Sequence, residues 1–165
     1  AAIVRASAGE NGHPAHGGAK AGRGRTWEIV ASGSFLVPDS GDAMSWRIGD
    51  NGFCMTLSAQ VPEMIKSQLR PWLSQWLARH DLTLESIPNW AVHPGGPRIL
   101  SATASALGLP TNALATSSSV LAECGNMSSP TILFILERLQ ATRGAGPCVA
   151  LAFGPGLVVE AALLR

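Results

Sequence analysis

Charged residues are scarce in this chain. Only 14% of its 165 residues are Asp, Glu, Lys or Arg, against roughly 25% in an ordinary globular protein, while 46% are hydrophobic. This composition provides ample apolar material for the core of one domain, and the surplus suggests a surface that meets another domain or subunit. The net charge of +1 argues against a nucleic-acid groove or a site for an acidic membrane.

Cysteines and long apolar runs are also few. The three cysteines, Cys54, Cys124 and Cys148, are odd in number and scattered, so they predict neither a disulfide framework nor a zinc site, and we expect no metal. Such cysteine usage favours a reducing cytoplasm. No apolar run reaches the roughly 18 residues that a membrane span needs. The first residues also lack the basic region of a signal peptide.

The start of the chain reads as the middle of a buried strand, over residues 1–5. Positions 1–4 are small or apolar, have no polar lead-in and do not begin with Met, as an artificial boundary or a truncated reading frame would produce. Residues 7–25 are rich in Gly and basic side chains and have no periodicity. This second segment is therefore predicted to be a flexible surface loop.

Apolar strands alternate with helices along the rest of the chain. Strand-forming residues bounded by turn signals predict strands at 27–37, 44–48, 53–57, 89–92, 148–153 and 157–164. Apolar residues at helical spacing predict helices from Pro62 to Leu77 (kinked or split at Pro71), over 97–107 and over 128–143, with a helical turn at 119–123. This order indicates an α/β layer whose sheet is buried on both faces.

Three loops place small or polar residues where a site can form. In the first, 90–97, His93 follows a buried strand and precedes a helix, so it can point into a cleft at the carboxyl end of the strand. Gly95 and Gly96 allow a backbone or a ligand to come close, and the turn can also hold an anion. Taken alone, however, such a His is more often a satisfied core or loop residue.

The other two loops also have plain interpretations. In the second, 123–130, Asn126 stands just before a long helix and reads as its N-cap, a role for which Ser128 and Ser129 compete. The third, 153–157, contains Gly154 and Pro155 and predicts a tight turn between two core strands.

Together and in this order, the loops resemble the C-terminal half of type III polyketide synthases, the chalcone synthase-like enzymes. The resemblance rests on VHPGGP at 92–97, GNMSS at 125–129 and FGPGL at 153–157. It is close over about residues 44–165 and loose over 7–43. It implies that residues 1–165 are the C-terminal thiolase-like domain of such an enzyme. The expected fold class is α/β, the C-terminal half of a thiolase fold, with a βαβαβ-type layer and a buried mixed sheet.

The resemblance also implies roles for individual residues. His93 and Asn126 would stabilise the enolate formed when malonyl-CoA loses CO2. Seven residues would contact substrate: Met55 and Ser128 lining the cavity, Gly154 and Pro155 shaping cyclisation, and Gly95, Gly96 and Arg98 near coenzyme A. A solvated helix residue is an equally good interpretation of Arg98.

No cysteine fits the family's nucleophile, which lies at a strand-to-helix elbow. Cys54 and Cys148 lie in apolar strands and are predicted to pack in the core, and Cys124 is predicted to be a packing residue beside Asn126. By resemblance the nucleophile belongs to an N-terminal half absent from these residues, so we expect this chain alone to be inactive. Trp46 either narrows the cavity or packs outward in its strand.

The resemblance implies acyl-CoA and malonyl-CoA as substrates without a further cofactor, a Cys-bearing N-terminal half as partner, and a homodimer of the full enzyme in the cytoplasm. Bacterial synthases of alkylresorcinols or alkylpyrones are the most similar in the segment 44–62. Two alternatives stay open. One is a ketoacyl-ACP synthase III-like condensing enzyme, which uses a His and an Asn from equivalent loops. The other is a non-catalytic thiolase-fold interaction partner.

Overall fold

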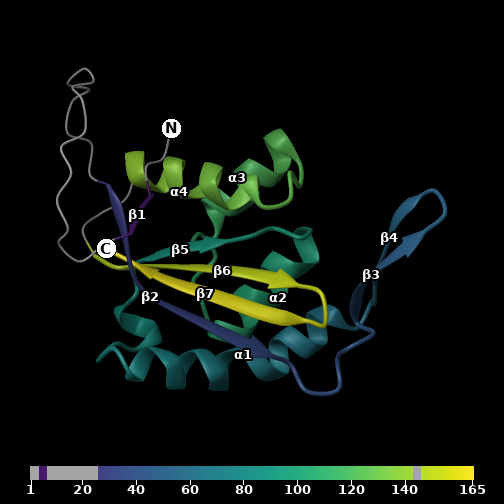
Figure 1. Cartoon of the computed structure of the whole chain (residues 1–165). Coiled ribbons are helices and arrows are strands. Elements are labelled where there is room, and N and C mark those ends of the chain that lie inside the picture. The colour runs from purple at the N-terminus through teal and green to yellow at the C-terminus, as the bar shows by residue number, and fades with distance from the viewer. Residues whose placement is uncertain (1–3, 7–25, 143–145) are drawn as a thin grey trace, which may run out of the picture.

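A mixed five-stranded sheet with helices on both faces forms the body of the molecule (Figure 1). The computed structural model describes residues 4–6, 26–142 and 146–165. The strand order is β1-β2-β7-β6-β5, with β7 antiparallel to β2 and β6, and β5 parallel to β6. The strands are β1 (Val4–Ala6), β2 (Trp27–Leu36), β5 (Asn89–Val92), β6 (Cys148–Gly154) and β7 (Val158–Leu164). The predicted loop at 7–25 lies outside the described residues.

Two separate cores lie on opposite faces of this sheet, because successive strand residues point to opposite sides. In β6, Val149 and Leu151 belong to the larger core, while Cys148 and Ala150 belong to the smaller one. All four residues of β5 are buried. The predicted α/β layer with a sheet buried on both faces is therefore confirmed in this part of the sheet, as is the core position of Cys148.

The larger core is covered by α1 (Val61–Ala78) and α2 (Pro97–Leu107). The apolar stripe of α1 is fully buried, as Ile65, Leu69 and Leu73 show. The expectation that Pro71 splits this helix is wrong, because a single helix runs through it. Pro71 is exposed, so the carbonyl left without a partner can bind water while the opposite stripe anchors the helix.

The smaller core is covered by α3 (Ala115–Cys124) and α4 (Pro130–Thr142). Trp27 is fully buried there, and its Nε1 donates to the carbonyl of Leu136 at 3.0 Å. The short helical turn predicted at 119–123 is in fact a longer helix, because tertiary contacts stabilise the Ser-rich segment 116–119 that local propensity disfavours. The fourth helix begins at Pro130, a residue suited to a first helical turn, rather than at 128.

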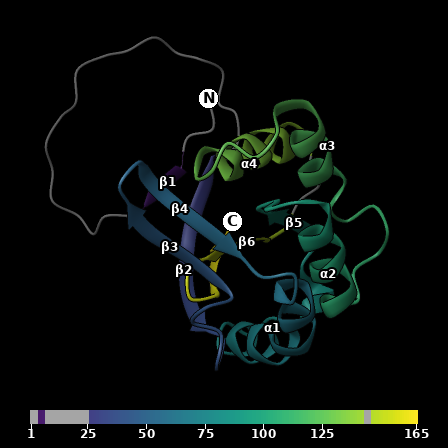
Figure 2. The same cartoon turned by 90° about the vertical axis from the view of Figure 1, so that its right-hand side faces the viewer.

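A two-stranded hairpin, β3 (Met44–Gly49) and β4 (Gly52–Leu57), stands beside the sheet (Figure 2). Its register pairs Met44 with Leu57 and Trp46 with Met55, so these four apolar side chains share one face. That face, which we call the apolar hairpin face, also includes Ile48 and is largely exposed.

The opposite hairpin face carries small or polar side chains: Ser45, Arg47, Cys54 and Thr56. Cys54 is exposed, so its predicted place in a core is wrong. The strand itself was correctly predicted. The error arises because β4 pairs only with β3 and belongs to neither core.

Candidate functional site

His93 continues the ladder of β5 beyond its last strand residue. Its backbone N–H donates to the carbonyl of Leu151 at 2.8 Å. The alternation of the strand therefore carries the His93 side chain to the face where Ala91 lies, which α3 and α4 cover. The side chain is half-buried, and this burial lowers the pKa of His93 because it disfavours the charged imidazolium. A neutral imidazole with one N–H to donate is thus favoured near neutral pH.

The segment after His93 opens a cavity at the start of α2. Gly95 N–H donates to the His93 carbonyl at 3.1 Å, which folds the chain back before the helix. A cavity of about 340 Å³ is lined by Leu57, Ser58, Ala59, Pro62, Gly95, Gly96, Pro97, Arg98 and Ile99. It brings together the three residues that the resemblance places near coenzyme A. Arg98 is exposed on the first turn of the helix. Its exposure is compatible both with a coenzyme A contact and with a solvated helix residue.

Asn126 does not cap α4. Its Oδ1 accepts a hydrogen bond from the backbone N–H of Ser128 at 2.8 Å, which is an Asx turn lying ahead of the helix. The N-cap interpretation is therefore wrong, since α4 begins only at Pro130. Because a backbone N–H needs an oxygen acceptor, this contact fixes the orientation of the amide. The Nδ2 group of the exposed Asn126 side chain remains as a donor.

The turn 125–129 has an unusual backbone. Gly125 and Ser128 both have positive φ, at 69° and 63°, and the second of these is a strained conformation for a residue with a side chain. Besides the Asx turn, Met127 N–H donates to Thr131 Oγ1 at 2.9 Å. Thr131 is completely buried, so this contact ties the turn to the body of the molecule.

The Gly154–Pro155 loop joins β6 to β7, as predicted. It is fixed to the hairpin, because Gly156 N–H donates to the carbonyl of Met44 at 2.7 Å. The buried hydroxyl of Ser40 also lies 2.7 Å from the Gly156 carbonyl. Gly154 is half-buried and Pro155 is exposed. The loop therefore has a defined position between the sheet and the hairpin.

Four of the predicted segments meet at one edge of the sheet, namely the edge formed by the carboxyl ends of β5 and β6. Because β5 and β6 are parallel, His93, which follows β5, and Gly154, which ends β6, lie at the same end of the two strands. The hairpin reaches both loops, through Met44 to one and through Leu57 in the cavity wall to the other. The Asn126 turn lies at the start of α4, which precedes β6 and so begins at this same edge (Figure 1).

Met55 and Ser128 are both exposed and do not line the cavity beside Gly95. Met55 shares the apolar hairpin face with Trp46, and their side chains are 55% and 53% exposed. Trp46 thus does not pack in the five-stranded sheet. The substrate contacts of Met55 and Ser128 stay predictions.

Sequence reasoning missed one buried polar side chain that holds this edge together. Ser117 is completely buried in α3, and its Oγ accepts the Val92 N–H at 3.1 Å. Since β5 is the last strand of the described sheet, this hydroxyl satisfies a backbone donor that lacks a strand partner. A Ser-rich segment beside an apolar strand is the only signal that the sequence offered.

Residues 28–165 match the C-terminal domain of chalcone and stilbene synthases. The chain belongs to this family. Among its relatives, the 1,3,6,8-tetrahydroxynaphthalene synthase of Streptomyces peucetius subsp. caesius is 39% identical over 155 residues, which cover 92% of this chain and 41% of the relative. The alpha-pyrone synthesis polyketide synthase-like Pks18 of Mycobacterium tuberculosis is 34% identical over 142 residues, 82% of this chain and 36% of the relative.

A solved structure agrees with this assignment. The crystal structure of PKS-I from the brown alga Ectocarpus siliculosus superposes with a TM-score of 0.79 at 33% identity and covers 88% of this chain and 41% of its own. The chain therefore has the fold of the C-terminal part of a type III polyketide synthase, within the thiolase fold. It spans about two fifths of the length of the three relatives described above.

Two further properties bear on the class of protein. Within residues 4–6, 26–142 and 146–165, no helix is both long enough and apolar enough to cross a lipid bilayer. In the same ranges, no three His, Cys, Asp or Glu side chains gather where they could bind a metal ion.

Proposed function

We propose that this chain supplies the enolate-binding half of the condensing site of a type III polyketide synthase. The single observation that carries the proposal is the pair of hydrogen-bond donors at one edge of the sheet. His93 is held with a lowered pKa, and Asn126 has its oxygen engaged by its own backbone. Both groups can therefore present an N–H to a developing oxyanion.

The chemistry follows from these donors. A starter acyl-CoA transfers its acyl group to the cysteine thiolate of the first half of the fold and releases coenzyme A. Malonyl-CoA then loses CO2, and the electron pair of the broken bond forms an enolate of acetyl-CoA. The enolate carbon attacks the acyl thioester, forms a carbon–carbon bond and expels the cysteine thiolate. His93 and Asn126 stabilise the enolate oxygen, where each donor contributes about a hundredfold or more in rate.

The other residues shape and position the substrates in this proposal. Gly95, Gly96 and Arg98 contact the coenzyme A portion, since they line a cavity next to His93. Gly154, Pro155, Met55 and Ser128 border the space in which the chain grows and cyclises. The nucleophilic cysteine comes from the first half of the fold, and the full enzyme is a homodimer of the cytoplasm.

The test is a reconstitution. This chain is incubated with malonyl-CoA and a long-chain acyl-CoA, alone and then with a Cys-bearing first half from the same family, and products are identified by mass spectrometry. We expect activity only in the mixture. Asn126→Ala and His93→Ala should each reduce malonyl-CoA decarboxylation about a hundredfold or more while acyl-CoA still binds.

Each other outcome has a definite meaning. Unchanged decarboxylation in the Asn126→Ala mixture would falsify the proposed role of this amide. Activity of the chain alone would place a nucleophile within these residues, with Cys124 the first candidate. Turnover of an acyl carrier protein substrate in preference to acyl-CoA would favour the ketoacyl-ACP synthase III-like alternative. Tight association with a first half without any turnover would favour an interaction partner.

A further inference from the structure

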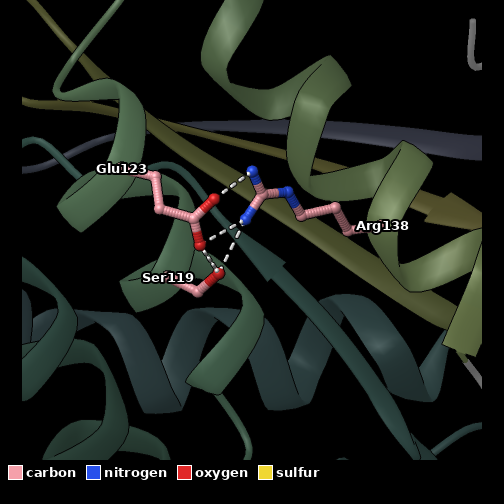
Figure 3. Close-up of polar contacts among 3 residues, drawn as sticks. All are labelled: Ser119, Glu123 and Arg138. Atoms are coloured by element: carbon pink, nitrogen blue, oxygen red, sulfur yellow. Dashed lines mark hydrogen bonds and ion pairs between the residues drawn. The ribbon is translucent and has the colours of Figure 1, made fainter.

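A cluster of three polar side chains joins α3 to α4 (Figure 3). One of them, Glu123, lies three residues before Asn126. Arg138 of α4 donates through both terminal nitrogens to the carboxylate of Glu123, at 3.0 and 2.8 Å. Ser119 completes the cluster, because its hydroxyl donates to Glu123 at 2.9 Å and accepts from Arg138 at 2.7 Å. This two-pronged pairing of arginine and carboxylate is the most directional ion pair available to a protein.

The cluster holds the last residues of α3, 122–124, which lie outside both cores. The buried residues of this helix are Ser117 and Val120, and the half-buried Leu121 packs against the larger core. The three residues that follow, 122–124, are exposed. Glu123 lies in the last turn of the helix, where a carboxylate is disfavoured by the negative end of the helix dipole. The local preferences of a helix end therefore do not explain why a glutamate stands at position 123, whereas the contact with Arg138 does.

The segment that follows needs such support. The turn 125–129 contains two residues with positive φ and is exposed apart from the half-buried Met127. Its path is defined by where α3 ends and where α4 begins. Glu123 lies two residues before the turn, and Arg138 extends from the helix that follows it. The ion pair, together with the shared core contacts of Val120 and Ile135, thus sets the separation of the two helices that the turn must connect.

We propose that Ser119, Glu123 and Arg138 form a positioning cluster that holds the Asn126 turn, and thereby the amide donor, in place for the condensation. This inference rests on the proposed function, because it gives Asn126 the role of an enolate donor. The three side chains do not touch the reacting atoms. Hydrogen bonds from Arg138 and Ser119 lower the pKa of Glu123, which keeps the carboxylate charged and the cluster intact across the neutral range.

The first test measures the order of the turn in the full 165-residue chain. Hydrogen–deuterium exchange is followed at the amides of Met127 and Ser128, both of which are bonded within or beside the turn. Glu123→Gln should accelerate their exchange about tenfold by allowing local opening. The charge-swapped double variant E123R/R138E should restore slow exchange. Glu63→Gln, which breaks a comparable 2.7 Å ion pair with Lys66 on α1, is the matched control and should change nothing at the turn.

The second test links the turn to chemistry in the mixture with a Cys-bearing first half. Glu123→Gln should lower decarboxylation about tenfold, less than removal of the Asn126 amide, because a displaced donor still acts part of the time. Acylation of the cysteine by the starter should keep its rate, since it does not use Asn126. A merely structural defect would lower both steps and would not be rescued by E123R/R138E.

The outcomes separate this proposal from the proposed function. Unchanged exchange in Glu123→Gln overturns the positioning role, whatever the activity. Faster exchange with unchanged decarboxylation also overturns it, because the order of the turn then does not matter for catalysis. If Asn126→Ala itself retains decarboxylation, the proposed function fails, and the exchange experiment still reports whether the cluster orders the turn.

Discussion

The two loops that carry the proposed donors are held in different ways. His93 follows a strand whose residues are all buried, and its backbone is part of the sheet. Asn126 lies in an exposed turn that is held by hydrogen bonds, by the packing of the half-buried Met127 against the smaller core and, as we propose, by one ion pair. Apolar packing and the sheet thus fix one donor, and mainly polar contacts fix the other. The comparison indicates that the Asn126 side of the site is the more easily displaced by substitution, salt or pH.

The largest effect should come from the packing beneath His93. Leu151 pairs with Val92 across the sheet and is 1% exposed. Leu151→Ala should reduce the free energy of unfolding by about 2–5 kcal/mol, because it leaves a cavity in the larger core. Urea denaturation measures this. Leu133→Ala on α4, where the side chain is 48% exposed, is the control and should cost well under about 2 kcal/mol. Equal losses in the two variants would contradict the distinction between the loops.

A smaller effect is expected where the two regions touch. The buried Ser117 hydroxyl accepts the Val92 N–H, so Ser117→Ala leaves a buried donor without a partner. The expected loss is about 1–3 kcal/mol of unfolding free energy, with faster exchange of the Val92 amide. Ser101→Ala removes an exposed hydroxyl that bonds within α2 and should have little effect. If Ser117→Ala changes neither the free energy of unfolding nor the exchange of the Val92 amide, water or another group replaces the hydroxyl.

A still smaller effect should come from the polar tie of the Asn126 turn. Thr131→Val keeps the shape of the side chain and removes the acceptor of the Met127 N–H. Since Met127 is only half-buried, its amide can turn to water, and the expected loss is about 0.5–1.5 kcal/mol. Thr142→Val makes the same exchange in an exposed position of the same helix and should be neutral. If the two variants unfold alike, Thr131 does not anchor the turn.

The smallest effect concerns pH. Burial places the pKa of folded His93 below its ordinary value, so the unfolded chain binds a proton first as pH falls. Folding should therefore lose stability as pH drops below about 6.5, the ordinary His value, towards the lower folded pKa. The carboxylates of Glu85 and Glu123, whose pKa values are lowered, act in the same direction at more acidic pH.

His93→Gln isolates the histidine contribution. The variant should weaken the dependence of the unfolding free energy on pH between about pH 6.5 and the folded pKa of His93. The loss of stability at more acidic pH, which the two glutamates cause, should be unchanged. Urea titrations at several pH values measure both limbs. The assignment fails if the variant and the parent chain lose stability in parallel. Mixing with a Cys-bearing first half should raise the pKa of His93, since a nearby thiolate favours the imidazolium.

Much of the sheet could be predicted because its apolar runs are bounded by Gly and Pro. The strand 89–92 and the helix 97–107 have the predicted bounds, the latter closed by Gly108 in a left-handed conformation. The Ser-rich α3 and the path of α1 through Pro71 were not predicted, because tertiary packing decides both. The same limit explains Cys54, since alternation in a strand does not say which sheet the strand joins.

The family was predicted through the order of three motifs, and the family match confirms it, while the roles of the site residues stay predictions. No local pattern indicated that Asn126 closes an Asx turn or that Glu123 reaches Arg138. The first depends on the positive φ of Ser128 and the second on the approach of two helices. Such contacts join residues that are distant in sequence or lie in irregular backbone, and periodicity carries no information about either.

The apolar hairpin face has a consequence for how this family can diversify. The hairpin is attached to the body at its base, through Met44 and through Ser58, whose N–H bonds to the Ala43 carbonyl. Its outward side chains, such as Ile48 at 85% exposure, belong to neither core. Mutations there can change size and shape without the folding penalty that a core residue would incur. The fold therefore carries, next to the proposed site, an element whose side chains can change in size without disturbing either core.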